Sequence, residues 1–286
     1  MQVFDTIKEL QAAISIQKGT SKKVGFVPTM GALHKGHLSL VELALKENEV
    51  VVVSIFVNPT QFNNPDDLKN YPRTLESDLE LLKDLSPDFV FAPAVDEIYP
   101  AKGIVKPAVN LGLLEKTMEG KHRPCHFNGV VQVVARLFEI VQPDKAYFGS
   151  KDFQQLAVIK EMTRQLKLPI EIASGETIRD ADGLAMSSRN VLLSAEQRSE
   201  ASGISKALFY IRDNWKVKSA AELCSEAIRR IEKNGLMKVE YLELADSNTL
   251  ETIHSFDQSP VPRIFTAVQV GKVRLIDNIG IIKGDD

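Results

Sequence analysis

The sequence predicts an α/β protein, with a doubly wound parallel sheet followed by a smaller C-terminal α+β domain. Up to about residue 176, short apolar runs rich in β-branched residues alternate with longer runs of helix formers. This alternation is typical of parallel strands that helices cover on both faces. Beyond that point, two helical stretches precede three strand-like runs, which indicates a separate unit with an antiparallel meander.

The elements of the first domain follow one another as strand, helix and strand. The expected strands are short apolar runs that end in turn residues, at 23–28, 50–57, 88–92, 145–148 and 170–173. The expected helices have apolar residues at helical spacing, at 38–46, 74–83, 130–141 and 152–167. Parallel strands joined in this way are connected by right-handed crossovers. The first domain is therefore predicted to be doubly wound.

After Gly175 the pattern changes. Residues 179–190 are small and polar, which predicts a loop. Two helices are expected, at 195–214 and at 219–233, with Ser219 as the N-cap of the second. The strand-like runs of this part lie at 238–245, 263–270 and 273–277. We place the boundary near residue 176, which gives an N-terminal domain of residues 1–176 and a C-terminal domain of residues 177–286.

The charge balance limits the classes of partner. The 286 residues include 35 basic and 38 acidic side chains, a formal net charge of −3. No run of five or more like charges occurs, which argues against a nucleic-acid partner or a polybasic membrane surface. The longest apolar run, at 50–57, is far shorter than the ~20 residues of a membrane-spanning helix.

The N-terminal segment and the cysteines indicate the compartment. Asp5, Lys8 and Glu9 interrupt the stretch where a signal peptide would be apolar. The sequence has two cysteines, Cys125 and Cys224, so no disulfide framework is indicated. We therefore expect a cytoplasmic protein with neither a membrane nor a nucleic-acid partner.

The first candidate site is the segment PTMGALHKGHL, between the first predicted strand and the first predicted helix. A P-loop is excluded, because His37 and Leu38 stand where Lys and Ser or Thr are needed, and G-x-G-x-x-G is absent. His34 and His37, three residues apart, can both face a phosphate at the start of the helix, where free backbone N–H groups favour anions. The alternative is that one histidine caps a turn and the other lies on the surface. The pair at a strand-to-helix turn favours phosphate chemistry.

The second candidate site is FGSKDFQQ, again between a strand and a helix. Lys151 would bring a point charge to a phosphate, and Asp152 occupies the cap or the first turn of the helix. Gln154 and Gln155 offer neutral donors and acceptors suited to hydroxyl groups. A capped helix with solvated polar residues explains this segment equally well.

The third candidate site is MSSRN, residues 186–190, in the predicted interdomain loop. Consecutive hydroxyls beside Arg189 can bind phosphate oxygens through hydrogen bonds and a guanidinium fork. An ordinary surface turn is the alternative, but loops between domains can close over a ligand.

Two shorter segments add single residues. His122, Cys125 and His126 suggest metal ligands, but three candidates without a second cluster make a zinc site improbable. Arg123 is the more useful residue there, as a cation for an anionic ligand. Gln61 follows the second strand and could face the same crevice as His37, although a turn directed by proline explains it as well.

Five stretches of the sequence, in this order and spacing, closely resemble the pantoate–β-alanine ligase family. They are FVPTMGALHKGHLSLV, IFVNPTQFNNPDDLKNYPRT, RPCHFNGVVQVVARLF, FGSKDFQQL and RDADGLAMSSRN. The resemblance covers most of residues 24–193, and the remainder is much less diagnostic. His34 and His37 alone would indicate only the wider HxGH nucleotidyltransferase superfamily, in which MSSRN resembles the mobile KMSKS loop of class I aminoacyl-tRNA synthetases. The combination with NPTQF and GSKDFQQ narrows the resemblance to the ligases.

The resemblance implies a Rossmann-like fold and a two-step reaction. ATP would activate the carboxylate of (R)-pantoate as pantoyl adenylate with release of pyrophosphate, and β-alanine would then attack the acyl carbon to give pantothenate and AMP, in the route to coenzyme A. Mg²⁺ would be carried by the ATP phosphates without a dedicated protein metal site. Members of the family are typically homodimers.

The resemblance also implies roles for individual residues. His37, as proton donor, would act in catalysis with His34 and Lys151. Gln61 and Gln155 would hold pantoate, Gln61 would also help to place β-alanine, and Arg123 would be a cation on the pantoate or phosphate side. Ile178 would lie near the adenine. The remaining residues implied to bind ATP are Met30, Gly31, Ala32, Leu33, Lys35, Gly36, Gly149, Ser150, Asp152, Met186, Ser187, Ser188 and Arg189.

The sequence departs from the family pattern at two positions. A glycine usually stands at the position of Cys125, and a glutamate at that of Ser150. Neither residue is among those implied to act in catalysis, so the activity is expected to persist. The alternative function is that of another HxGH adenylyltransferase, acting on nicotinamide mononucleotide or phosphopantetheine. A catalytically silent nucleotide-binding regulator is a further alternative, which the retained His34, His37 and Lys151 argue against.

Overall fold

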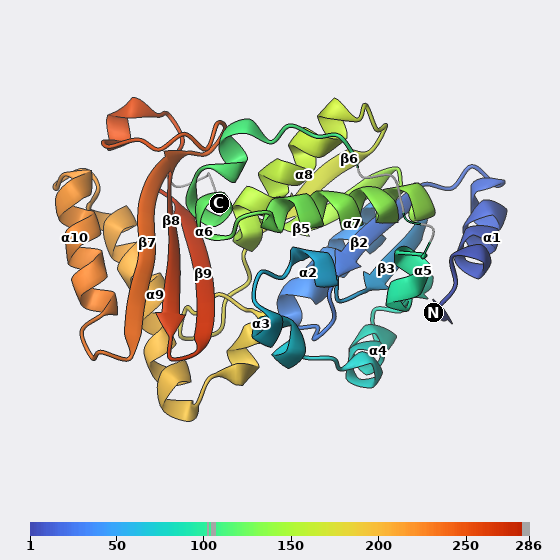
Figure 1. Ribbon diagram of the computed structural model, residues 1–286, viewed down its shortest axis with the longest axis horizontal. Helices are drawn as coiled ribbons and strands as arrows, with labels where there is room; N and C mark the ends of the chain where they lie inside the picture. The colour runs from blue at the N-terminus through green and yellow to red at the C-terminus, as the bar shows by residue number, and fades with distance from the viewer. Residues whose placement is uncertain (102, 104–106, 282–286) are drawn as a thin grey trace. The chain divides into compact units, whose positions relative to one another are not determined.

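The computed structural model describes residues 1–101, 103 and 107–281 of the chain, which fold into two compact units (Figure 1). Unit 1 consists of Met1–Leu111, Arg123–Gly149 and Gln155–Gly175. Unit 2 consists of Gly112–His122, Ser150–Gln154 and Glu176–Asp286. Residues 282–286 of the expected C-terminal domain lie outside the described residues.

Unit 1 contains a six-stranded parallel sheet in the order β1-β4-β3-β2-β5-β6. Its strands are β1 (Gln2–Phe4), β2 (Val24–Thr29), β3 (Val50–Ile55), β4 (Phe89–Phe91), β5 (Lys145–Gly149) and β6 (Glu171–Gly175). From β2 the chain moves outward through β3 to β4, and then crosses to the other side of β2 for β5 and β6. This reversal confirms the predicted doubly wound sheet. Ligands of such sheets bind beyond the carboxyl ends of the strands at the reversal, here β2 and β5.

Helices pack on both faces of this sheet. The helices of unit 1 are α1 (Ile7–Lys18), α2 (Lys35–Glu47), α3 (Pro65–Asn70), α4 (Leu75–Lys83), α5 (Val95–Ile98), α7 (His126–Val141) and α8 (Phe153–Gln165), of which α3 has no buried residue. Side chains alternate between the two faces of a strand, so neighbouring residues of β2 face different helical layers. Val27 joins the core formed with α2 and α4, which includes Leu82. The ring of Phe26 instead meets Phe138 of α7, with 6.3 Å between centroids.

Helix α7 begins at His126 rather than at the predicted Val130. Glycine is a poor helix former, so Gly129 weakens the helical pattern in the sequence. The packing nevertheless requires it, because a Cβ at Gly129 would lie 2.4 Å from the carbonyl oxygen of Thr60. The helix therefore packs directly against the backbone of the 3-10 turn η1 (Pro59–Gln61).

Strand β1 and helix α1 are not among the predicted elements. β1 has three residues, too few to show an alternating pattern. It pairs with Phe89–Phe91 of β4, which lie far from it in the chain. Helix α1 is capped by Thr6, whose side chain accepts a hydrogen bond from the Glu9 amide at 3.4 Å. Both elements extend the sheet and its helical layer beyond the expected strands.

Unit 2 contains a three-stranded antiparallel sheet in the order β7-β8-β9. Its strands are β7 (Met237–Asp246), β8 (Pro262–Val270) and β9 (Val273–Gly280), and its longer helices are α9 (Ala195–Asn214) and α10 (Ala220–Ile231). Its short elements are α6 (Met118–His122), η2 (Gly112–Glu115), η3 (Ser150–Asp152), η4 (Ser188–Leu192) and η5 (Phe256–Gln258). These elements confirm the predicted α+β meander, and Ser219 caps α10 by accepting from the Glu222 amide at 3.3 Å. Strand β9 runs past its predicted end at Asp277, because the polar pair Asp277 and Asn278 is buried in it.

No helix of the described residues is both long enough and apolar enough to cross a membrane.

Candidate functional site

The turn between β2 and α2 is built from left-handed residues. Gly31 has φ +77° and Ala32 has φ +49°, which turns the chain sharply after the end of β2. The hydroxyl of Thr29 accepts a hydrogen bond from the Gly31 amide at 3.2 Å and donates to the Ser54 carbonyl of β3 at 2.7 Å. The residues Met30–Leu33 therefore lie at the carboxyl end of the central strands, where the sequence predicts a site.

A buried carboxylate from α4 holds this turn in place. Asp78 is 1% exposed, and its two oxygens accept from the amides of Ala32 at 3.0 Å and Leu33 at 2.7 Å. The sequence interpretation did not identify Asp78 as a site residue. A signal was present, because an acidic residue among the apolar residues of the predicted helix 74–83 needs a buried partner. That partner lies 45 and 46 residues earlier in the chain.

We expect Asp78→Ala to lower the free energy of unfolding by about 2–3 kcal/mol, because two buried amides lose their acceptor. Urea unfolding of the variant measures the loss. Glu76→Ala is the matched control, since Glu76 is an exposed acidic residue of the same helix. Equal midpoints for Asp78→Ala and Glu76→Ala would contradict this role of Asp78.

The two histidines cap helix α2 with their own rings. His34 is the N-cap, and its Nδ1 accepts from the Gly36 amide at 3.2 Å. His37 Nδ1 accepts from the His34 amide at 3.3 Å, and the two rings lie 4.0 Å apart between centroids. A ring nitrogen that accepts a hydrogen bond carries no proton, so each neutral imidazole presents Nε2–H as its donor.

This geometry corrects one expectation about the helix start. The backbone amides expected to be free for an anion are partly engaged, because the Gly36 amide donates to His34 Nδ1 and the His37 amide donates to the His34 carbonyl at 2.8 Å. The capping alternative is confirmed for His34. Capping and ligand binding are compatible here, since the Nδ1 atoms cap the helix and the Nε2–H groups are directed donors.

Gln61 lies in a network of amides after β3. Asn58, 1% exposed, donates through Nδ2 to Gln61 Oε1 at 3.0 Å and to the Gly129 carbonyl at 3.1 Å. The side-chain nitrogen Nε2 of Gln61 lies 3.1 Å from the sulfur of Met30. The hydroxyl of Tyr99 donates to Asn58 Oδ1 at 2.8 Å, and burial raises the pKa of this phenol. The structure therefore brings Gln61 to Met30 and fixes the orientation of its amide.

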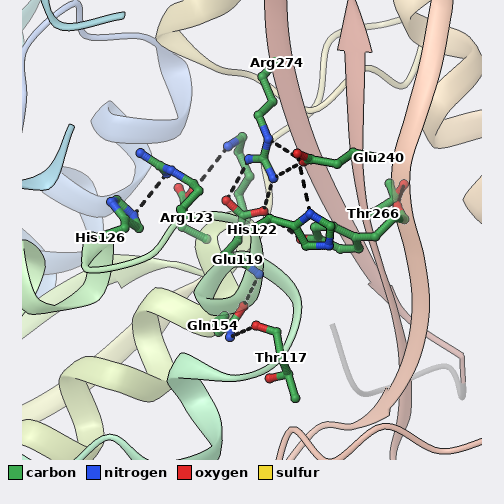
Figure 2. Close-up of polar contacts among 12 residues, drawn as sticks. Thr117, Glu119, His122, Arg123, His126, Gln154, Glu240, Thr266 and Arg274 are labelled. Atoms are coloured by element: carbon green, nitrogen blue, oxygen red, sulfur yellow. Dashed lines mark hydrogen bonds and ion pairs between the residues drawn. The ribbon is translucent and has the colours of Figure 1, made fainter. Parts of the chain in front are cut away.

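His126 joins Arg123 to the Gln61 backbone. His126 Nδ1 lies 2.7 Å from the Gln61 carbonyl oxygen, which can only accept, so Nδ1 carries the proton. Arg123 Nη1 lies 3.1 Å from His126 Nε2 and can only donate, as Figure 2 shows for this pair. His126 is thus a neutral ring that orients Arg123. The sequence interpretation considered His126 only as a metal ligand and missed this role.

Cys125, the residue before helix α7, stands where the family pattern has a glycine, and its backbone conformation explains that preference. Cys125 has φ +65° and ψ −1°, a left-handed conformation that favours glycine, and it precedes α7 as its N-cap residue. Within the part of the chain that the structure describes, no group of three or more His, Cys, Asp and Glu residues could hold a metal ion. His122, the remaining residue of the HRPCH segment, has Nδ1 3.6 Å from Glu240.

The segment around Lys151 forms the short turn η3 in unit 2. Lys151 Nζ lies 3.4 Å from Asp152 Oδ1, and the side chain of Lys151 is 18% exposed. Ser150 is buried, Gly149 ends β5, and Gln155 is half-buried in α8. The carbonyl oxygens of Ser150 and Lys151 both accept from Asn278 Nδ2, at 3.1 and 2.8 Å.

The expectation that Gln154 offers its amide to a hydroxyl ligand is wrong. Gln154 is 4% exposed, and its Oε1 accepts from the Glu119 amide at 3.0 Å. Its Nε2 donates to the carbonyls of Leu114 at 2.9 Å and Thr117 at 3.0 Å. The Gln154 amide therefore holds α6 and the residues before it. These partners lie far from Gln154 in the chain, so the sequence around Gln154 does not indicate them.

The loop predicted at 179–190 is ordered as a small hairpin in unit 2. Arg179 and Ala185 form a β-bridge, and the Met186 amide donates to the Ile178 carbonyl at 3.0 Å. Ser187 caps η4 by accepting from the Arg189 amide at 3.3 Å. Ile178 is thereby brought next to the MSSRN segment, as a shared ligand would require.

A charged cluster fixes α6 within unit 2. Figure 2 shows Arg274 between two carboxylates, with bonds of 2.8 Å to each oxygen of Glu119 and one of 2.7 Å to Glu240. The Tyr241 hydroxyl donates to Glu119 at 2.8 Å, and burial followed by the Glu119 charge raises the pKa of this phenol well above its usual value. The side chain of Glu119 is 8% exposed. This cluster follows from no motif in the sequence.

The described structure thus assembles the predicted site residues in two groups. Unit 1 contains Met30–His37 and Gln61, which follow the carboxyl ends of β2 and β3, together with Arg123, Gly149 and Gln155. Unit 2 contains Ser150–Asp152, Ile178 and Met186–Arg189. Each group by itself offers neutral and cationic hydrogen-bond donors, which suit anionic groups such as phosphates and carboxylates.

Comparison with known proteins identifies the family. The family model described as "Pantoate-beta-alanine ligase" matches residues 2–280. Pantothenate synthetase of Bacteroides fragilis is 49% identical over 284 residues, which cover 98% of both chains. The crystal structure of pantothenate synthetase from Thermus thermophilus superposes with a TM-score of 0.92 at 42% identity, over 98% of this chain and 99% of that one.

A further solved relative was crystallised with ligands. The pantoate–β-alanine ligase of Francisella tularensis, complexed with β-γ ATP and β-alanine, is 36% identical to this chain with a TM-score of 0.82. The match covers 100% of both chains. The matches extend through the C-terminal residues that the sequence motifs leave undiagnosed. The chain described here belongs to the pantoate–β-alanine ligase family.

Proposed function

We propose that this protein condenses pantoate with β-alanine in an ATP-dependent reaction that forms pantothenate, a step of pantothenate and coenzyme A biosynthesis. The observation that carries the proposal is the His34–His37 pair, whose Nε2–H donors lie at the carboxyl end of β2 in a chain of this family. Another HxGH adenylyltransferase is not favoured, because the similarity to pantoate–β-alanine ligases extends over residues 2–280.

The reaction has two steps that balance without a protein nucleophile. The pantoate carboxylate attacks the α-phosphorus of ATP, and pyrophosphate leaves with the electrons of the broken P–O bond. The β-alanine amine then attacks the acyl carbon of pantoyl adenylate, AMP leaves, and the nitrogen loses a proton. ATP enters as its Mg²⁺ complex, so the cation comes with the substrate.

Negative charge accumulates on the phosphates during adenylation, and the proposed site supplies donors to it. His34 and His37 would donate through Nε2–H, with His37 also as proton donor, and Lys151 would add a point charge. The residues proposed to contact ATP comprise Met30–His37, Gly149–Asp152, Ile178 beside the adenine, and Met186–Arg189 over the phosphates. Preorganised donors of this kind are usually the largest catalytic contribution.

Pantoate would be held by Gln61 and Gln155, with Arg123 as the cation for its carboxylate or the neighbouring phosphate. Support comes from the orientation of these groups: Asn58 fixes the Gln61 amide, and the His126 ring orients the Arg123 guanidinium. Gln61 would also help to place β-alanine. No dedicated protein metal site is proposed.

The organisation around this chemistry is part of the same proposal. We propose that residues 1–176 bind ATP and pantoate and that residues 177–286 act as a lid, because the polar segment 179–190 lies at the boundary. A homodimer and a cytoplasmic location are proposed from the family resemblance, with no membrane or nucleic-acid partner. Solution scattering with and without ATP and pantoate tests the lid, and an unchanged radius of gyration would contradict a large closure.

One assay tests the reaction. We expect AMP to form from ATP only when pantoate and β-alanine are both present, with pantothenate in equal amount. An adenylyltransferase would instead incorporate AMP into nicotinamide mononucleotide or phosphopantetheine. The absence of turnover at saturating ATP, pantoate and β-alanine would favour a silent nucleotide-binding regulator.

A further inference from the structure

Two adjacent buried residues near the end of β9 hold the segments of unit 2 that the proposed function assigns to ATP. Asp277 is 4% exposed and Asn278 is 3% exposed. Both are polar positions in a strand whose neighbours Leu275 and Ile279 belong to the core of unit 2. Buried polar side chains in such a strand are costly unless they are fully bonded, so their partners show what they hold.

Asp277 fixes the start of the hairpin that leads to the MSSRN segment. Arg179 donates through Nη1 to Asp277 Oδ2 at 2.7 Å and through Nη2 to Asp277 Oδ1 at 2.9 Å. Arg179 is paired with Ala185 in the β-bridge, one residue before Met186. A bidentate pair with a nearly buried carboxylate leaves the guanidinium little freedom, so this end of the hairpin is fixed on β9.

Asn278 fixes the turn that carries Lys151. Its Nδ2 donates to the carbonyl oxygen of Ser150 at 3.1 Å and to that of Lys151 at 2.8 Å. The amide cannot be reversed, because Arg263 Nη1, which can only donate, lies 2.7 Å from Asn278 Oδ1. Arg263 is itself 2% exposed, and its guanidinium lies 4.2 Å from the centroid of the Phe153 ring.

These contacts matter because a lysine side chain is long and flexible. The position of its charge is limited first by the direction of its Cα–Cβ bond, which the backbone sets. Asn278 holds the carbonyls on both sides of the Lys151 nitrogen and α-carbon, since the Ser150 carbonyl precedes Lys151 and the Lys151 carbonyl follows it. A displacement of about 1 Å in such a group can cost about 10²-fold in rate.

We propose that Asn278, oriented by Arg263, is a positioning residue for Lys151 in the adenylation step. This inference rests on the proposed function, because it assigns Asn278 an effect only through the role of Lys151 there. Asn278 contacts backbone atoms of the turn and is not itself placed among the groups that touch the substrate.

The variant Asn278→Asp tests the proposal with little change of shape. It replaces the Nδ2 donor with an oxygen that faces two carbonyl oxygens, and it keeps an acceptor for Arg263. Asn278→Ala removes both interactions. Asn248→Asp is the matched control, since Asn248 is an exposed asparagine in the turn after β7 of the same unit.

The deciding measurement is a double-mutant cycle with Lys151→Ala, read as the rate of pantoate-dependent exchange of pyrophosphate into ATP. We expect Asn278→Asp to slow exchange by about 10- to 100-fold, and the double variant to be no slower than Lys151→Ala within about threefold. If the fold-decreases of the two single variants multiply in the double variant, the proposal is overturned. An exchange rate of Asn278→Asp equal to that of Asn248→Asp would also overturn it. Failure of Asn278→Asp to fold would make Asn278 a folding residue and would also overturn it.

A second readout separates this inference from the proposed function. ATP affinity is measured by calorimetry for the same four proteins, and we expect the same non-additive pattern. A wild-type protein without pantoate-dependent exchange would contradict the proposed function, while the calorimetric cycle would still decide whether Asn278 acts through Lys151. An active wild type with additive affinities would contradict the Asn278 proposal alone.

Discussion

His37→Ala and Lys151→Ala are each expected to slow adenylation by about 10²-fold or more, as the loss of a preorganised donor to a charged transition state does. In the structure, His37 presents Nε2–H because its Nδ1 accepts from the His34 amide at 3.3 Å. Lys151 brings a positive charge on the turn held by Asn278. The measurement is the initial rate of pyrophosphate release at saturating ATP and pantoate.

The controls separate loss of a donor from loss of structure. His254 is an exposed histidine of unit 2, and His254→Ala should retain the wild-type rate. His37→Gln retains an acceptor at the third position of α2, where glutamine completes a capping box, so it keeps the cap while removing the imidazole. Near-normal pyrophosphate release in His37→Ala and Lys151→Ala would contradict the roles assigned to both residues.

Local sequence patterns were sufficient to locate the strand ends of the sheet and the motifs attached to them. β2 and β5 end where the sequence places turns, and His34 begins α2 directly after the first motif. Apolar runs and turn residues are local properties, and the carboxyl-end rule for parallel sheets then converts the strand order into the position of a site. The histidine pair and Lys151 are proposed as site residues on this basis.

The residues that hold those motifs were not found, because their partners lie far away in the chain. Asp78 binds amides about 45 positions earlier, and Asn278 binds carbonyls 127 and 128 positions earlier. Gln154 shows the opposite error: it resembles a ligand-binding glutamine until its three bonds to residues 114–119 are known. A polar residue in an apolar pattern signals a buried partner, but one sequence does not identify that partner.

Arg274→Met is expected to lower the free energy of unfolding by about 3–5 kcal/mol, the usual cost of removing one partner from a buried ion pair. Arg274 makes two 2.8 Å bonds to Glu119, whose side chain is 8% exposed. Although burial lowers the pKa of Arg274, its bonds to Glu119 and Glu240 outweigh this and hold the pKa above its usual value. The variant takes both Arg274 bonds from the nearly buried Glu119 carboxylate, and the midpoint of urea unfolding measures the result.

The matched control has the same geometry on the surface. Arg164 also binds a glutamate through two nitrogens, at 2.7 and 2.8 Å to Glu161, but its side chain is 72% exposed. Water and salt screen a surface pair, so Arg164→Met should leave the urea midpoint nearly unchanged. Equal midpoints for Arg274→Met and Arg164→Met would show that the cluster in Figure 2 does not stabilise unit 2.

The pH dependence distinguishes loss of the Arg274 charge beside Glu119 from simple loss of packing. In Arg274→Met, Glu119 loses the neighbouring positive charge of Arg274, and loss of an opposite charge makes a carboxyl group bind its proton more tightly. A group that binds its proton more tightly in the folded state stabilises that state at low pH, and this contribution is lost as the pH rises. The deficit of Arg274→Met relative to wild type should therefore shrink between pH 7 and pH 5. Glu119→Gln combined with Arg274→Met should remove this pH dependence, because no charge remains at position 119, whereas a deficit equal at both pH values would attribute the loss to packing alone.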